Sequence, residues 1–318
     1  MLFEMMYGTR EPYEYFTCGK CACLQIKDIP DDLSRHYPQN YYSYTPSGHR
    51  KNRPHMLSRL KFDYIFFRKG LPGRFLAGLK PEAYGQFRCF QKVPLHHQSR
   101  ILDVGCGSGR DLIKMQELGF THLKGIDPYI PEAIDYGQGL TIDKKTLHEV
   151  EGQWDIIKFN HVFEHLDNPA EILKEVKRLL AYGGTCIIRI PVVPCHAFDA
   201  YGIHWVQLDA PRHLYLHSVE SMSELARVAE LNLDIEQIYY DSTSDQFLGS
   251  ELYQKGIPLI TATGNLKHYF SRRKLQQFKS QARQLNLCRR GDQAVFYLSK
   301  ALAEPGCDAE KLRSEAVL

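Results

Sequence analysis

Three alternating glycines follow a short apolar run and open a helical pattern. They are Gly105, Gly107 and Gly109, directly after the run at 101–104. Glycine permits positive φ and leaves no Cβ between backbone and ligand, and a helix start presents unpaired N–H groups. The spacing G-x-G-x-G differs from the dinucleotide-binding G-x-G-x-x-G, and no P-loop Gly-Lys-Ser/Thr follows. The loop therefore predicts a ligand site of another kind at the end of a strand.

An acidic residue ends the next apolar run, 122–126. Asp127 stands there, followed by Pro128. A carboxylate at the end of a second strand is placed to accept hydrogen bonds from both hydroxyls of a ribose. Together with the glycine loop, it predicts a site for a ribose-containing cofactor.

The segment from Asp103 to Gly109, taken with Asp127, resembles the class I S-adenosylmethionine-dependent methyltransferases. In that family the glycine loop packs against the methionine part of the cofactor, the acid holds the ribose, and residues after the third strand flank the adenine. The family often has Gly-Asp at the adenine position, where this chain has Asp-Lys-Lys-Thr-Leu at 143–147. The resemblance implies these cofactor contacts: Asp103, Gly105, Cys106, Gly107, Gly109, Asp127, Pro128, Thr146, Leu147 and Asn160.

Two histidines follow the fourth apolar run, 155–160. The sequence HVFEHLDNP at 161–169 resembles the family segment with "LEH" ahead of "NP", with Phe163 in place of the leucine. Ligands of open α/β sheets bind at the carboxyl ends of the strands, so we expect His161 and His165 near the cofactor or the acceptor. An imidazole there is a candidate general base. The alternative for His165 is that it only fixes its loop by a backbone hydrogen bond.

A long connection, 190–218, follows the fifth apolar run, and we expect no helix in it. Loops of this length are often functional. Its D-x-P-R-H pattern resembles small-molecule and sugar methyltransferases of the superfamily. We interpret Asp209 and His213 as candidate catalytic residues, and Trp205 and Arg212 as candidate acceptor contacts. An Asp–Arg pair that only braces the loop is the alternative.

Metal binding is not expected. Cys18 and Cys21 have the C-x-x-C spacing of a zinc knuckle, and the chain resembles sugar C-methyltransferases that carry an N-terminal zinc ribbon. No second knuckle is visible, so free thiols are favoured, although Cys23 or His36 could add a ligand. A Tyr-rich stretch at 38–44 is interpreted as a lid or as packing. The sequence shows no carboxylate pattern of a metal-assisted transferase.

From about residue 99, predicted strands and helices alternate, and these elements must position the residues described above. A helix is predicted after Asn168 as its N-cap, and a second from Ser218 to Glu230. Such alternation predicts right-handed crossovers and a doubly wound, Rossmann-like α/β sheet of seven mostly parallel strands, as the resemblance also implies. The predicted strands are 101–104, 122–126, 140–143, 155–160, 185–190, 233–240 and 293–298.

The chain divides into three parts. Residues 1–93 are expected to form an N-terminal appendage, half like a zinc ribbon. Residues 94–300 form the methyltransferase domain, with a helical insertion at 243–290 before the last strand. Residues 301–318 form a polar tail.

Composition limits the function classes. The 318 residues are 43% apolar and 24% charged, as in ordinary soluble globular proteins. A net charge of +3 is too small to indicate a nucleic acid or membrane partner. No apolar run reaches the ~18 residues of a membrane span. The nine cysteines and the start Met-Leu-Phe-Glu, which lacks an export signal, favour reduced thiols in the cytoplasm.

These patterns predict an S-adenosylmethionine-dependent methyltransferase acting on a small molecule. A sugar, a lipid or a secondary metabolite is the expected acceptor, methylated on oxygen or carbon. The alternative is a non-catalytic S-adenosylmethionine-binding protein that acts in a complex or as a sensor.

Overall fold

The computed structural model describes residues 1–37, 56–79, 85–262 and 269–300. The Tyr-rich stretch 38–44 and the tail 301–318 lie outside the described residues. Within the described part, the central sheet has nine strands. These are β5 (Ile101–Val104), β6 (Leu123–Ile126), β7 (Ile134–Gly137), β8 (Leu140–Asp143), β9 (Trp154–Asn160), β10 (Leu180–Pro191), β12 (Leu231–Leu233), β13 (Tyr239–Tyr240) and β14 (Gln293–Lys300).

The strand order places the predicted site residues at one edge. The order is β12-β14-β10-β9-β5-β6-β8-β7, and β13 also pairs with β14. The five strands from β10 to β8 run parallel, so the segments after Val104, Ile126 and Asn160 all lie at the same edge of the sheet. Because β14 runs the opposite way, its first residue, Gln293, lies opposite Pro191 at that edge too. The predicted fold class, a mostly parallel doubly wound sheet, is confirmed.

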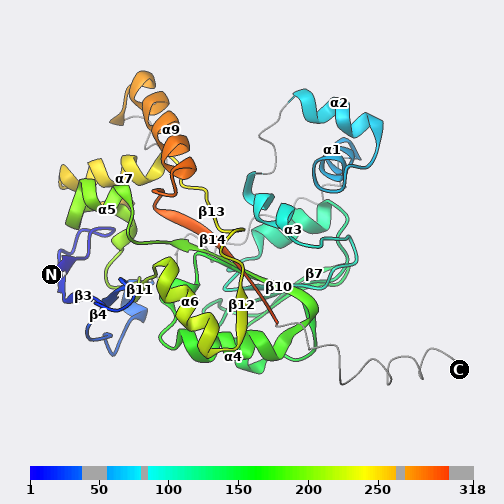
Figure 1. Cartoon of the computed structure of the whole chain (residues 1–318), viewed down its shortest axis with the longest axis horizontal. Helices are drawn as coiled ribbons and strands as arrows, with labels where there is room; N and C mark the ends of the chain where they lie inside the picture. The colour runs from blue at the N-terminus through cyan, green and yellow to red at the C-terminus, as the bar shows by residue number, and fades with distance from the viewer. Residues whose placement is uncertain (38–55, 80–84, 263–268, 301–318) are drawn as a thin grey trace, which may run out of the picture.

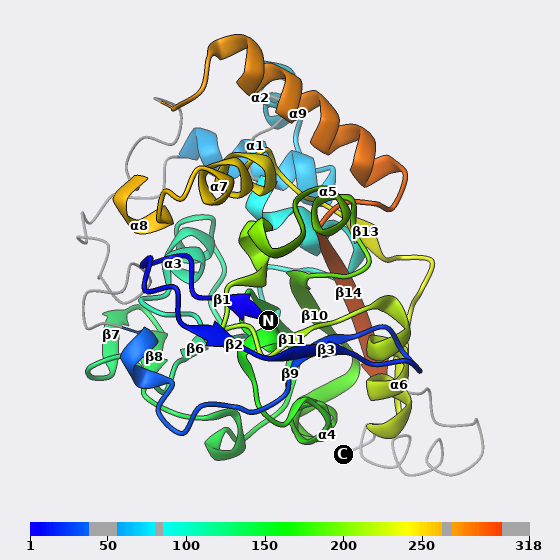
Figure 2. The same cartoon turned by 90° about the vertical axis from the view of Figure 1, so that its left-hand side faces the viewer.

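Helices cover both faces of the sheet (Figures 1 and 2). Neighbouring strand residues such as Ile101 and Leu102 are fully buried but belong to different core clusters, because successive side chains point to opposite faces. One cluster contains residues of α4 (Pro169–Leu179) and α6 (Val219–Val228), and the other contains residues of α1 (Met56–Phe67) and α3 (Arg110–Glu117).

Several sequence expectations need correction. The predicted strand 233–240 is split into β12 and β13, and β7, which forms a hairpin with β8, was not predicted. The connection 190–218 contains a helix, α5 (His196–Tyr201). Pro169 begins α4 as expected, but the Asn168 side chain makes no capping hydrogen bond. Ser218 does cap α6, since its side chain accepts a bond from the N–H of Ser221 at 2.9 Å.

The N-terminal segment packs on that long connection. It contains β1 (Leu2–Phe3), β2 (Pro12–Tyr13), β3 (Tyr15–Thr17) and β4 (Leu24–Ile26). The strand β11 (Tyr215–Leu216) pairs with β4, so this small sheet joins the first residues of the chain to the predicted acceptor loop. Leu2 and Leu24 share a buried cluster with Trp205 and Leu216.

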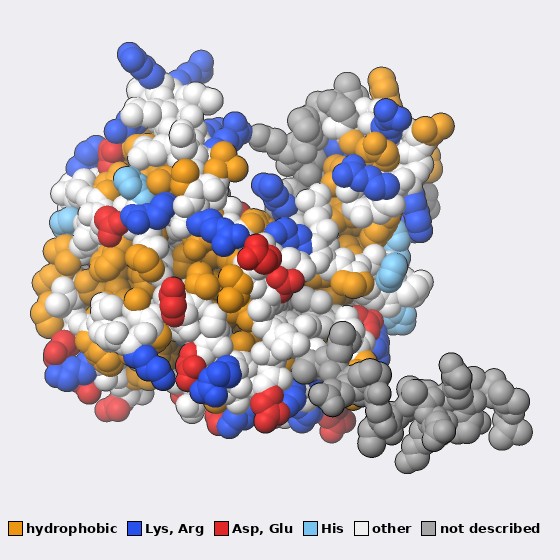
Figure 3. Space-filling view, viewed as in Figure 1, with side chains coloured by type: hydrophobic (Ala, Val, Ile, Leu, Met, Phe, Trp, Pro, Cys, Tyr) orange, Lys and Arg blue, Asp and Glu red, His pale blue; other side chains and the backbone are white. Residues whose placement is uncertain are grey.

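Among the described residues between β13 and β14 are the helices α7 (Asp245–Gln254), α8 (Leu259–Ala262) and α9 (Arg272–Leu287). In Figure 3 the molecular surface is hollowed between two lobes. One lobe contains α7 and α9, and the other contains α1 and α2 (Leu71–Leu79). No helix in the described ranges is long and apolar enough to cross a membrane.

Candidate active site

The loop after β5 requires glycine for two reasons. Gly105, Gly107 and Gly109 have φ of 66°, 54° and 72°, a region that side chains disfavour. A Cβ on Gly105 would also lie 2.5 Å from a methyl carbon of Val162, and a Cβ on Gly109 would lie 2.6 Å from Cδ1 of Ile142. The loop therefore turns tightly into α3, whose first N–H groups point toward the edge of the sheet.

Asp127 closes β6 beside this loop. Its Oδ2 accepts a hydrogen bond from the N–H of Gly107 at 2.9 Å, and its Oδ1 accepts one from the N–H of Tyr129 at 2.9 Å. Burial raises its pKa, while these two N–H groups act in the opposite direction. A carboxylate has about four lone-pair sites, so Asp127 keeps acceptors for the two hydroxyls of a ribose. The adjoining Pro128 is exposed.

A buried lysine beneath the glycine loop was missed in the sequence. Lys158 on β9 places Nζ 3.0 Å from Asp103 Oδ2 and 2.7 Å from Asp111 Oδ2. Lys158 and Asp103 are almost completely buried. Burial raises the pKa of Asp103 to about 6 even though the ammonium favours its charged form. Asp103 thus lies near the end of its strand in a buried pair with Lys158, just before the glycine loop, and its contact with a cofactor stays a prediction. A lysine inside the apolar run DIIKFN was the available signal.

The other residues predicted to bind the cofactor, including those expected beside the adenine, occupy varied positions. Thr146 caps a short 3-10 turn and donates from its hydroxyl to Glu149 at 2.8 Å, and Leu147 is buried in the core. Asn160 ends β9, and its Oδ1 accepts a bond from Arg189 at 3.1 Å. Cys106 is half-buried in the glycine loop. Their contact with a cofactor stays a prediction.

A cavity of about 210 Å³ lies at the same edge of the sheet. Its walls come from the ends of β9 and β10, the connection before β11, the start of α7 and the start of β14. The polar lining is suited to a small hydrogen-bonding molecule. Sequence reasoning identified His161 but missed the other lining residues, which are Arg189, Gln207, Thr243, Asp245, Gln246, Asp292 and Gln293.

His161 is held between a cation and an anion. Its Nε2 accepts a hydrogen bond from Arg189 Nη1 at 2.9 Å, and its Nδ1 lies 3.3 Å from Oε1 of Glu164. The acceptor role of Nε2 fixes the proton on Nδ1, facing the carboxylate. Its φ of 56° lies in the left-handed region, which is uncommon for residues other than glycine. Burial raises the pKa of Glu164, but the imidazoles of His161, His165 and His213 outweigh it and lower the pKa to about 2.

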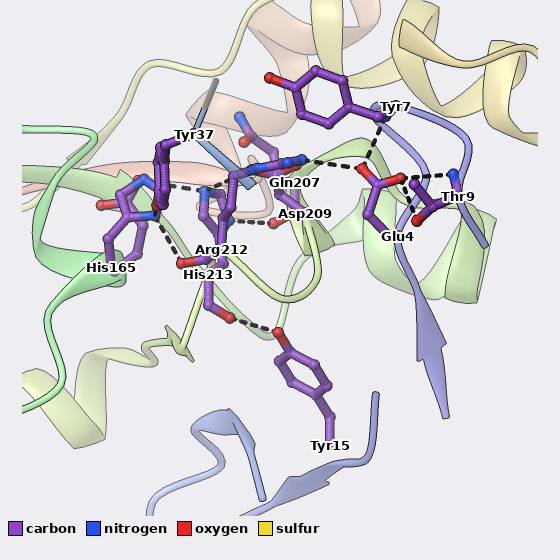
Figure 4. Close-up of polar contacts among 11 residues, drawn as sticks. Glu4, Tyr7, Thr9, Tyr15, Tyr37, His165, Gln207, Asp209, Arg212 and His213 are labelled. Carbon is purple, nitrogen blue, oxygen red and sulfur yellow. Dashed lines mark hydrogen bonds and ion pairs between the residues drawn. The ribbon is translucent and has the colours of Figure 1, made fainter. Parts of the chain in front are cut away.

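The predicted acceptor loop forms a buried ion-pair network (Figure 4). Arg212 donates to both carboxylate oxygens of Asp209, with Nε to Oδ2 at 2.9 Å, and lies 3.6 Å from Oε1 of Glu4. The pKa of Asp209 is held well below its usual range by Arg212, which outweighs burial. Asp209 is therefore a poor base, and the interpretation of Asp209 and Arg212 as a brace fits better than direct catalysis or acceptor contact.

Two further residues of this loop point inward. Trp205 has no exposed surface, and its Nε1 donates to Asp292 Oδ2 at 3.1 Å, so the placement does not support a stacking contact with an acceptor. His213 is buried, with Nδ1 2.7 Å from the carbonyl oxygen of Gln207. Burial, followed by the neighbouring His165, lowers the pKa of His213 to about 4, so its imidazole is neutral near pH 7.

His165 contacts a backbone carbonyl, and its role in catalysis stays a prediction. Its Nδ1 lies 2.8 Å from the carbonyl oxygen of Arg212 and 3.1 Å from the hydroxyl of Tyr37. Tyr37 in turn stacks on Tyr129, with ring centres 6.0 Å apart. The N-terminal segment thus extends across the edge of the sheet to the residues that follow Asp127.

The cysteine segment forms the turn between β3 and β4. The N–H of Cys18 donates to the carbonyl of Cys23 at 2.8 Å, and the N–H of Ala22 donates to the carbonyl of Cys18 at 2.8 Å. Cys23 is buried, which raises the pKa of its thiol to about 12. In the described ranges, these thiols join no cluster of three potential metal ligands. The resemblance to half a zinc ribbon stays a prediction.

Comparison with known proteins gives the family. A model of a methyltransferase domain family matches residues 74–237, more than half of the chain, and the chain therefore belongs to that family. The match includes the glycine loop, Asp127, His161 and the acceptor loop. Its outer limits exclude the N-terminal sheet, α7 and β14.

Individual relatives are more distant. The chain is 28% identical over 166 residues to a ubiquinone biosynthesis O-methyltransferase of Maricaulis maris, covering 46% of this chain and 65% of the relative. It is 34% identical over 99 residues to the enzyme of the same name from Caulobacter sp., covering 28% and 39%. The chain thus spans less than two thirds of these relatives' length. A solved mycolic acid cyclopropane synthase has 15% identity and a TM-score of 0.44, covering 78% of this chain and 99% of that one.

Proposed function

We propose that the chain transfers the methyl group of S-adenosylmethionine to a hydroxyl oxygen of a small molecule. The observation that carries the proposal is the shared edge of the sheet, where a positive-φ glycine loop and a buried carboxylate lie beside a polar cavity. The backbone of Gly105 to Gly109 would cradle the methionine part of the cofactor, and Asp127 would hold its ribose. The names of the O-methyltransferase relatives support oxygen as the acceptor atom.

The chemistry is an in-line displacement. The acceptor oxygen forms a bond to the methyl carbon while the carbon–sulfur bond breaks, and the sulfonium becomes a neutral thioether. The hydroxyl proton must leave to a base. We assign this role to Nε2 of His161, which lines the cavity, while Glu164 orients the ring through Nδ1. In this assignment the acceptor hydroxyl replaces Arg189 as the donor to Nε2.

Cofactor binding is the first test. Calorimetry should show S-adenosylhomocysteine binding to the wild type, and Asp127→Ala should raise its Kd at least about 100-fold. That estimate follows from losing two hydrogen bonds to a charged acceptor, each contributing about 1.5–3 kcal/mol. Asp31→Ala is the matched control, since Asp31 is an exposed aspartate, and its Kd should equal that of the wild type. A wild-type chain that binds no S-adenosylhomocysteine would refute the proposal.

Transfer is tested with methyl-labelled S-adenosylmethionine and a panel of phenols, catechols and sugar nucleotides. At least one hydroxyl acceptor should take up label. His161→Asn should lower kcat about 100-fold or more while the Kd for S-adenosylhomocysteine stays unchanged. Cofactor binding without label transfer to any acceptor would favour a non-catalytic binding protein instead.

A further inference from the structure

Three side chains beside the acceptor cavity converge in a way that hydrogen bonding within the protein does not explain. Glu164, His165 and His213 each place a potential ligand atom within 4.8 Å of the other two. Glu164 has no exposed surface. Both of its carboxylate oxygens are buried, and within the described part of the chain neither meets the geometry of a hydrogen bond. A buried carboxylate of this kind requires a compensating positive charge.

Each of the two histidines has one ring nitrogen without a proton, and in His213 this nitrogen faces the carboxylate. Nδ1 of His165 lies 2.8 Å from the carbonyl oxygen of Arg212, and Nδ1 of His213 lies 2.7 Å from that of Gln207. A carbonyl oxygen only accepts, so each neutral ring carries its proton on Nδ1. Nε2 is then the unprotonated nitrogen of both rings, and that of His213 lies 3.9 Å from Oε1 of Glu164. Lone pairs that converge on a carboxylate repel one another unless a cation lies between them.

We infer that Glu164, His165 and His213 bind a divalent transition-metal ion beside the acceptor cavity. Two imidazoles and one carboxylate are the ligands of open, catalytic Zn²⁺ and Fe²⁺ sites, in which further positions stay free for water or substrate. Metal-binding histidines commonly donate their second ring N–H to a backbone carbonyl, as both rings do here. Mg²⁺ fits less well, because it prefers oxygen ligands.

The charges around Glu164, His165 and His213 leave room for one bound cation. Nε2 of His213 also lies 3.7 Å from Oδ2 of Asp209, but that carboxylate is neutralised by its bidentate pair with Arg212. His161 directs Nδ1–H toward Glu164, because its Nε2 accepts a hydrogen bond from Arg189. Glu164 is therefore the uncompensated charge of the cluster, and its lone pairs can serve His161 and an ion together.

The site is placed to act on the acceptor, and in this respect the inference rests on the proposed function. His161 and Gln207, which line the cavity, contact Glu164 at 3.3 Å and His213 at 2.7 Å. A hydroxyl oxygen bound to the ion would lose its proton more readily. The proton passes to His161 or water, the oxygen bonds to the methyl carbon, and the carbon–sulfur bond breaks to give the thioether.

The test measures metal binding without turnover. Untagged full-length chain carrying Cys18→Ser and Cys21→Ser, which removes the knuckle thiols, is stripped with a chelator and titrated with Co²⁺. We expect one equivalent to bind, with visible d–d bands and no thiolate charge-transfer band. In the same background, Glu164→Gln and His213→Asn should each weaken binding at least about 100-fold, since even outer-shell partners contribute 10–100-fold. The exposed His148 gives the matched control His148→Asn, which should bind as the background does.

The results distinguish failure of the metal site from failure of the methyltransferase proposal. The metal site is overturned if Co²⁺ does not bind stoichiometrically, or if it binds equally well to Glu164→Gln and His213→Asn. The methyltransferase proposal stays intact in either case if S-adenosylhomocysteine still binds. Metal binding without S-adenosylhomocysteine binding overturns the methyltransferase proposal alone. Circular dichroism verifies folding, and if the buried variants unfold, His165→Asn at the partly exposed ligand decides the question by the same criterion.

Discussion

Lys158→Met removes a buried cation beside the glycine loop and is expected to destabilise the folded chain. The lysine side chain is 5% exposed and pairs with Asp103, also 5% exposed, and with Asp111, which is 28% exposed. After the substitution, Asp111 can regain water, whereas Asp103 stays buried as an unpaired carboxylate. Breaking a buried pair in this way costs about 3–5 kcal/mol. We expect the free energy of unfolding to fall by that amount near pH 8.

The loss of unfolding free energy in Lys158→Met is expected to grow as the pH rises. Burial already raises the pKa of Asp103 to about 6, and without the ammonium of Lys158 it should rise further. A folded-state pKa above the unfolded value of about 3.9 means that the folded state binds more protons, so its stability is present at low pH and lost as pH rises. The deficit of Lys158→Met should therefore be small near pH 5 and full near pH 8.

Urea unfolding followed by tryptophan fluorescence measures this difference. Lys174→Met is the control, because Lys174 is an exposed lysine paired with Glu171 on α4, and it should change stability by less than about 1 kcal/mol. Adding Asp103→Asn to Lys158→Met should recover about 1–3 kcal/mol, the coupling expected of a contacting pair. A loss below about 1 kcal/mol near pH 8, or a loss that does not grow with pH, would refute the reasoning.

Two further predictions concern local conformation. Gly109→Ala places a Cβ at φ 72° and 2.6 Å from Ile142 Cδ1, so we expect S-adenosylhomocysteine to bind at least about 10-fold more weakly by calorimetry. Gly19→Ala, with nothing within 4 Å of its Cβ, should bind normally, and equal affinities would contradict the role given to the loop. Ser218→Ala should destabilise the chain by about 1 kcal/mol in urea, whereas Asn168→Ala, which removes no capping bond, should change little. Equal losses in the two capping variants would count against the observed helix starts.

The loop and strand ends to which we assign the cofactor could be predicted in position, because they depend on short-range patterns. The strand 101–104 and the strand 140–143 have the predicted bounds, and the glycine loop and Asp127 directly follow predicted strands. The parallel order of the strands then brings these ends to one edge. Periodicity, turn residues and one topological rule suffice for this part.

The cavity to which we assign the acceptor depends on partners far apart in the sequence. Arg189 contacts Asn160 and His161 from the neighbouring strand, and Asp292 lies at the same edge only because β14 is antiparallel. Trp205 looked like a substrate contact by residue type, yet it is fully buried. Residue type and spacing do not reveal which side of a loop faces the core, so the burial of this residue could not be predicted.

This division bears on where acceptor specificity lies. The family match covers residues 74–237, which hold the glycine loop, Asp127 and the His161–Glu164 segment. Much of the cavity wall lies outside it, in the residues 243–246 and 292–293. The N-terminal segment, which contacts the acceptor loop through Glu4 and Tyr15, lies outside it as well. The family match therefore supports the proposed methyl transfer, whereas if the cavity binds the acceptor as proposed, part of its wall comes from residues that the family model does not match.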